Sequence, residues 1–155
     1  MLLKETALVR LLGLRIPMIL FVGPRVLELD EEGCAVEIPL GYRTRNHLGS
    51  MYFGALHVGA DLAGGLNAMR LVLTRHRKVK VIFKDARAEF LKRAEGDTVF
   101  RCRDGARVRQ AVEQAEQGGE RVTIPVEVVA TVPSLHGEEP VARFALGLSL
   151  KRKEE

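Results

Sequence analysis

One acidic residue stands inside the longest mostly apolar segment of the chain. Residues 52–75 are rich in glycine, alanine and leucine, and Asp61 is the only carboxylate among them. Apolar surroundings disfavour the charged form of a carboxyl group and raise its pKa, which suits a general base near neutral pH. The same carboxylate could instead act as a nucleophile. A polar loop, residues 41–50, precedes the segment and contains Asn46 and Gly49.

Two other interpretations of Asp61 and its neighbour stay open at this point. Asp61 could be a buried acid that pairs with a basic or hydroxyl group from a sheet or from a second subunit. His57 lies one helical turn before Asp61 and on the same face. It could orient or pair with the carboxylate, or it could be a histidine satisfied at an interface.

The segment that carries Asp61 predicts one long helix over residues 52–75. At 1.5 Å per residue, such a helix would be about 35 Å long. Glycines at 54, 59, 64 and 65 each cost a helix interior roughly 1 kcal/mol relative to alanine. A helix that tolerates them is expected to be buried against close neighbours.

The remaining chain predicts a second helix near the start and an antiparallel sheet. Residues 2–14 form an amphipathic pattern with Leu3, Ala7, Leu11 and Leu14 on one face, and Pro17 ends it. Alternating patterns predict strands over 24–29, 34–40, 79–91, 98–103, 121–132 and 141–150, with Pro125 at an edge or a bulge. Residues 106–117 fit a short exposed helix better than a loop, and residues 151–155 read as a frayed tail. Short turns between strands predict an α+β fold in a single domain, residues 1–155, with residues 1–23 as an N-terminal helical extension.

Composition limits the classes of function. No apolar run reaches the roughly 18 residues that span a bilayer, and Arg10 and Arg15 interrupt the apolar start, which excludes a signal peptide. Cys34 and Cys102 suit reduced thiols in a cytoplasmic protein and cannot form a cysteine zinc site. The net charge is +4, yet aromatic residues make up 5% and Trp is absent, which disfavours nucleic acid as a partner. The basic clusters are either solvated or contact an anionic small molecule such as coenzyme A, and no metal site is expected.

The central loop and helix resemble those of hotdog-fold acyl-CoA thioesterases, in which a curled antiparallel sheet wraps a central helix. Gly49, Gly54 and Asp61 follow Asn46 by three, eight and fifteen residues, which is the spacing of the phenylacetate-type branch. Tyr52 and Phe53 stand where that branch has His-Gly, and the YFGAL segment is similar to a less characterised hotdog subgroup.

The resemblance implies a set of site residues. The backbone N–H groups of Phe53 and Gly54, at a helix N-terminus, would stabilise the oxyanion of a thioester. Asp61 would be the general base or nucleophile, and Asn46 would hold the water or the carbonyl. Substrate contacts are expected from residues along the helix and at its end: Tyr52, His57, Gly64, Gly65, Arg75, Arg77 and Lys78. Coenzyme A is then part of the substrate, and no separate cofactor is implied.

Hotdog sites are usually built between subunits, so the resemblance also implies a homodimer or homotetramer in which Asn46 and Asp61 come from different chains. A non-catalytic protein that binds acyl-CoA or lipid is the main alternative, because Tyr52 and Phe53 replace the usual His-Gly. An acyl-thioester dehydratase or hydratase is a minor one, since His47 lies fourteen residues before Asp61. No membrane partner is expected.

Overall fold

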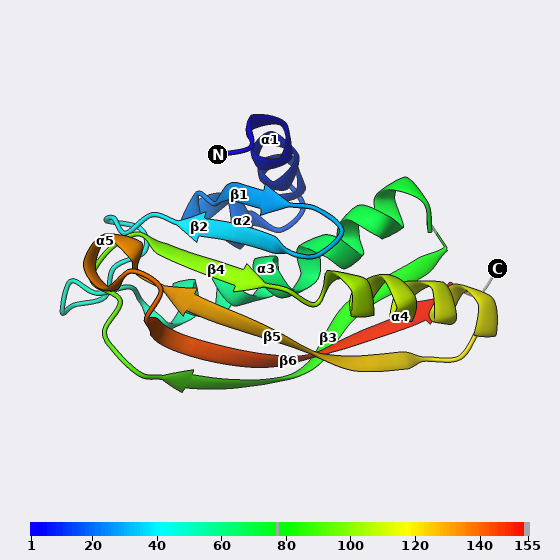
Figure 1. The fold of residues 1–155 in the computed structure, drawn as a ribbon. Coiled ribbons are helices and arrows are strands. Elements are labelled where there is room, and N and C mark those ends of the chain that lie inside the picture. Colours follow the sequence, from blue (N-terminus) through cyan, green and yellow to red (C-terminus); the bar gives the residue numbers. More distant parts are fainter. Residues whose placement is uncertain (77, 154–155) are drawn as a thin grey trace.

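A long helix, α3 (Phe53–Thr74), lies in the concave face of an antiparallel sheet. The computed structural model describes residues 1–76 and 78–153. The sheet has six strands in the order β1-β2-β4-β5-β6-β3. Their bounds are β1 Arg25–Leu29, β2 Cys34–Ile38, β3 Val79–Phe90, β4 Thr98–Cys102, β5 Val122–Thr131 and β6 Pro140–Arg152. The predicted α+β architecture, one central helix wrapped by a curled sheet, is confirmed (Figure 1).

The glycines of α3 explain how closely the helix approaches the sheet. A Cβ on Gly59 would collide with the ring of Phe100, which is fully buried in β4. A Cβ on Gly64 would lie 2.9 Å from Leu146 of β6. These two positions lack side chains because the sheet fills the space, as the sequence predicted for a buried helix.

The sheet register accounts for the proline in β5. Strand β4 pairs only with Val129–Thr131 of β5, whereas β6 pairs along the strand from Val122. Pro125 therefore lies where β5 has one neighbouring strand, a position at which a sheet tolerates proline. The edge position predicted for this proline is confirmed locally.

The N-terminal extension differs from the prediction in two ways. It contains two helices, α1 (Leu3–Leu12) and α2 (Pro17–Val22), and Pro17 occupies the first turn of the second helix, where its missing N–H is tolerated. The predicted apolar face of Leu3, Ala7, Leu11 and Leu14 is exposed to solvent. Thr6 and Val9 face the protein instead.

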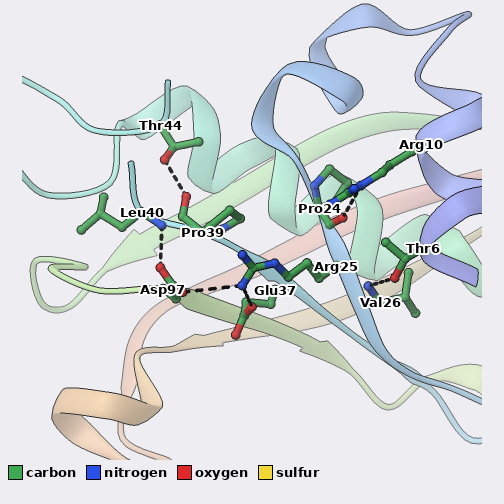
Figure 2. A network of polar contacts seen from close by, with 10 residues as sticks. All are labelled: Thr6, Arg10, Pro24, Arg25, Val26, Glu37, Pro39, Leu40, Thr44 and Asp97. Carbon is green, nitrogen blue, oxygen red and sulfur yellow. Dashed lines mark hydrogen bonds and ion pairs between the residues drawn. The ribbon is translucent and has the colours of Figure 1, made fainter. Parts of the chain in front are cut away.

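Polar contacts tie this extension and the central loop to the sheet (Figure 2). The buried hydroxyl of Thr6 accepts a 2.9 Å hydrogen bond from the Val26 N–H, so α1 is linked to β1. Nearby, Arg25 of β1 pairs with Glu37 of β2 at 2.8 Å. Asp97 accepts a 2.8 Å bond from the Leu40 N–H, which joins the segment before the loop to the start of β4.

The other expectations hold with small changes. The helix expected over 106–117 is present as α4 (Gly105–Gly118). A short helix, α5 (Pro133–His136), lies between β5 and β6. Strand β6 continues to Arg152, so residues 151 and 152 are paired and not frayed. The two cysteines are buried and unbridged, and they face each other across β2 and β4. None of the helices in residues 1–76 and 78–153 is long and apolar enough to span a membrane.

Candidate functional site

Asp61 lies in the wall of an apolar cavity beside the central helix. The cavity has a volume of about 310 Å³ and lies between α1, α2, α3 and the edge strand β3. Among the described residues that line it, Asp61 is the only charged one. The apolar walls include Val9, Leu12 and Ile19 from the extension, Leu66 and Met69 from α3, and Phe83 from β3.

The surroundings of Asp61 set its protonation. Desolvation by the neighbouring apolar groups raises the pKa of Asp61 above its ordinary value, although the residue is exposed to solvent in the single chain. No side chain in the described part of the chain forms a hydrogen bond or an ion pair with this carboxylate. The described part of the sheet therefore provides no hydrogen-bond or ion-pair partner for Asp61. A raised pKa and an unengaged carboxylate are properties of a general base.

The start of α3 presents backbone donors. Tyr52 is the N-cap residue in an extended conformation, and its side chain forms no capping hydrogen bond. The first N–H groups of a helix have no partners within the helix and carry partial positive charge. A Cβ on Gly54 would collide with the Tyr52 ring, so glycine allows this ring to lie close to the helix start. Tyr52 and Phe53 are both more than half exposed.

His57 belongs to an aromatic cluster. Its Nδ1 lies 2.9 Å from the Phe53 carbonyl oxygen, to which a protonated Nδ1 donates. Its ring centroid lies 4.3 Å from that of Phe53 and 5.4 Å from that of Phe144, with Phe90 alongside. The structure thus places His57 with these rings, and no hydrogen bond connects it to Asp61 in the described chain.

Asn46 shapes its own loop. Its Oδ1 accepts hydrogen bonds from the backbone N–H groups of Leu48 at 2.9 Å and Ser50 at 3.2 Å. Its Nδ2 donates to the Ser50 hydroxyl at 3.1 Å. The side chain is thereby fixed within the loop, half-buried in the single chain. His47, the residue considered for dehydratase chemistry, is exposed on the same loop.

Within one chain, the start of α3 and the Asp61 carboxylate are far apart. Phe53 and Asp61 are eight residues apart on α3, an axial rise of about 12 Å. A base must lie within about 3 Å of the group it deprotonates, directly or through one water. Oxyanion donors from one α3 and the carboxylate of the same α3 therefore do not act on the same carbonyl.

The expected substrate-binding residues do not gather in one place in the single chain. Gly65 lines the Asp61 cavity, whereas Gly64 faces the sheet. Arg75 follows the end of α3, about 21 Å along the helix from Asp61, and lines a separate pocket of about 250 Å³ with Asn67, Arg70 and Arg109. Lys78 is exposed just before β3. Arg77 lies outside the described residues.

Sequence patterns missed the contribution of the N-terminal extension to the cavity. Ile19 is 6% exposed and Val9 is 1% exposed, although most of their helical neighbours face solvent. The apolar composition of residues 1–23 indicated that part of the extension is buried. It did not show which side chains face the protein and which face solvent.

Comparisons with known proteins agree with this architecture. A family model, described as a domain of unknown function (DUF4442), matches residues 4–142. The chain belongs to this family. No curated protein matches the DUF4442 chain.

Solved structures resemble the DUF4442 chain over nearly its whole length. A Pseudomonas aeruginosa protein, named a probable thioesterase, is 28% identical, with 93% of each chain covered and a TM-score of 0.75. A Chlorobaculum tepidum protein of unknown function is 14% identical, with 97% of this chain and 95% of that chain covered and a TM-score of 0.80. A Haemophilus influenzae thioesterase is 14% identical, with coverages of 89% and 85% and a TM-score of 0.64. The last two support the fold alone. The hotdog fold implied by the sequence resemblance is confirmed.

Proposed function

We propose that this protein is an acyl-CoA thioesterase in which Asp61 acts as the general base or nucleophile. The observation that carries the proposal is the position of the Asp61 carboxylate, which lies unpaired among the described residues in the wall of an apolar cavity. The cavity suits an acyl chain, and the carboxylate suits activation of water or attack on the thioester carbonyl beside it. The name of the similar Pseudomonas aeruginosa protein supports the same reaction class.

The oxyanion donors in this proposal are the backbone N–H groups of Phe53 and Gly54 at the start of α3. A backbone donor does not depend on the side chain, so Tyr52 and Phe53 do not exclude this role. Because about 12 Å of helix separates these donors from Asp61 of the same chain, we place them opposite Asp61 of a second subunit, together with the Asn46 loop. The loop carries Asn46 in a fixed position, where it holds the water or the carbonyl.

The edge of the sheet supports such a second subunit. Strand β3 has twelve residues and pairs only with β6 in the described chain, so its other side is open to pairing. Ile82 and Phe90 on this strand are 53% and 46% exposed. A homodimer formed along β3 would bury these side chains, and a homotetramer could then form from two such dimers. Arg75, Arg77 and Lys78 precede β3 and would contact the coenzyme A phosphates.

The test is a panel of acyl-CoA substrates with a free-thiol readout. We expect turnover by the wild-type protein and a loss of at least a hundredfold in kcat for Asp61→Asn, since one positioned acid or base contributes about 10² to 10⁴. Glu113→Gln, which removes an exposed carboxylate on α4, is the control and should retain activity. Equal turnover by the wild type and Asp61→Asn would remove Asp61 from the mechanism.

A non-catalytic acyl-CoA or lipid-binding protein is the second candidate. The Phe53 ring, which contacts the His57 ring at a tilt of 50° at the start of α3, favours it because aromatic side chains lie close to the donors that the thioester must reach. Tight binding of an acyl-CoA without release of thiol across the panel would support binding alone.

A further inference from the structure

We propose that α1 and α2 form the outer wall of an acyl-chain cavity and that Ile19 limits the length of chain that this cavity accepts. The inference rests on the proposed acyl-thioester substrate and adds the element that determines chain length. It is carried by the cavity between the N-terminal extension, α3 and β3, into which Asp61 is built.

The direction of the bound chain follows from the charge distribution. Asp61 is the one charged group among the described residues of the wall, so the polar thioester end belongs beside it. Leu62, Leu66 and Met69 follow along the same helix, and Met69 lies about 12 Å of axial rise beyond Asp61. An apolar chain entering past Asp61 is therefore covered by α3 on one side and by Ile19 on the other.

The volume gives the size of the occupant. An apolar cavity of about 150 Å³ accommodates the six carbons of benzene. A cavity of about 310 Å³ accordingly holds an acyl segment on the order of ten carbons. The structure assigns medium-length aliphatic chains to this site.

Gly65 gives an independent reason to regard the cavity as functional. A Cβ at Gly59 or Gly64 would collide with the sheet, so packing explains these glycines. A Cβ at Gly65 would meet Phe83 at 3.4 Å, which is ordinary contact, so packing does not require glycine there. A helical glycine costs roughly 1 kcal/mol relative to alanine. At Gly65 the absence of a side chain leaves space in the cavity beside Asp61, and this space accounts for the glycine.

The wall is held in place by contacts with the sheet. The Thr6 hydroxyl and the Leu2 N–H bind the two backbone groups of Val26, at 2.9 and 2.7 Å. Ile19 is 6% exposed, whereas Met18 on the same helix is 58% exposed and lies outside the cavity. These two residues of α2 provide a matched pair for substitution.

The experiment measures acyl-CoA binding by calorimetry as a function of chain length, in the Asp61→Asn background so that substrate is not consumed. Ile19→Trp enlarges a buried side chain in the α2 wall and reduces the cavity volume, and Met18→Trp is its control. Each buried methylene contributes about fourfold to affinity. We expect Ile19→Trp to weaken the longest accepted chains by at least about tenfold while chains of about four carbons bind as before. Met18→Trp should leave the length profile unchanged.

Gly65→Ala tests the same cavity from α3 with a substitution that favours the helix. We expect the preferred chain to shorten, with about a fourfold loss for the longest chain. Gly118→Ala, at a helical glycine with open space around it, is its control. Both cavity variants are checked by circular dichroism and size exclusion, so a folding defect in one leaves the other as the test.

The outcomes separate this inference from the proposed function. A shifted length profile without thiol release from any acyl-CoA by the wild type supports the cavity and rejects the thioesterase. Turnover with an identical length profile in Ile19→Trp and Gly65→Ala overturns the cavity and leaves the thioesterase intact. A change of oligomeric state in these variants, with the length profile unaltered, shows that a second chain occupies the cavity and also overturns the inference.

Discussion

At the scale of single residues, the Asp61 carboxyl group is partly desolvated and has no partner in the described chain. Its pKa is raised by desolvation, and no group in the described chain compensates its charge. Ionisation of such a carboxyl group costs folding free energy, because the unfolded chain solvates the charge better. This cost is acceptable where the charge is used in function, which is the role proposed for Asp61.

The raised pKa predicts how stability and activity depend on pH. The folded protein binds the Asp61 proton more tightly than the unfolded chain, so this carboxyl contributes stability at acidic pH and loses it as pH rises through the folded pKa. Asp61→Asn should therefore unfold at a higher temperature than the wild type at neutral pH, and the difference should vanish below the ordinary carboxyl pKa of about 3.9. Thermal unfolding across pH measures this. A lower Tm for Asp61→Asn at neutral pH would contradict it.

The pH dependence of turnover follows from the same shift. If the ionised carboxylate is the base, kcat/KM should rise with pH through a pKa above about 3.9. A rate profile measured over acidic pH in the wild type tests this, with protein integrity monitored at each pH. An acidic limb at or below the ordinary carboxyl pKa would be inconsistent with Asp61 as the titrating group.

Gly59 sets the distance between α3 and β4. Gly59→Ala forces its methyl group into the ring of the fully buried Phe100, and such overpacking costs about 1–3 kcal/mol. Gly118→Ala meets no atom within 4 Å and should be neutral or slightly stabilising, since alanine favours a helix. Denaturant unfolding of both variants gives the comparison. Equal stability of the two would show that the helix shifts to accommodate the methyl group.

At the scale of elements, the extension α1–α2 depends on a few polar contacts as well as on its buried apolar side chains. Thr6→Val keeps the shape but leaves the Val26 N–H without its acceptor in a buried position. We expect a loss of about 1–3 kcal/mol in unfolding free energy and faster proteolysis within residues 1–23. Thr74→Val removes an exposed hydroxyl that bonds within its own helix and is the control. Unchanged protection of the extension in Thr6→Val would contradict the importance of this contact.

At the scale of the whole molecule, the proposed site requires two chains. Asn46→Ala and Asp61→Asn should each be inactive alone, because each removes one half of every site. After denaturation together and refolding, half of the dimers combine one chain of each kind, and each mixed dimer regains one intact site of two. The mixture should therefore recover about a quarter of wild-type activity. Recovery of none would show that Asn46 and Asp61 act within one chain.

Much of the fold could be predicted because the patterns were local. Alternation identified the six strands, and the small-residue segment around Asp61 identified α3. The outward direction of Leu3, Leu11 and Leu14 could not be predicted, because an apolar stripe does not reveal whether another element covers it. The shared cavity of Ile19, Asp61 and Phe83 was equally inaccessible, since these residues belong to elements far apart in the sequence.

The sequence by itself determined the order of the six strands and the long central helix, the spacing of Asn46, Gly54 and Asp61, and the hotdog resemblance that follows from them. Periodicity and short-range spacing are properties of residues that are close in the sequence, so they can be recognised without a structure. Only the tertiary structure decided that Gly65 faces a cavity while Gly64 faces the sheet, and that α1 and α2 line that cavity beside Asp61. These features arise from packing between distant segments, and packing is fixed by the shape of the whole chain.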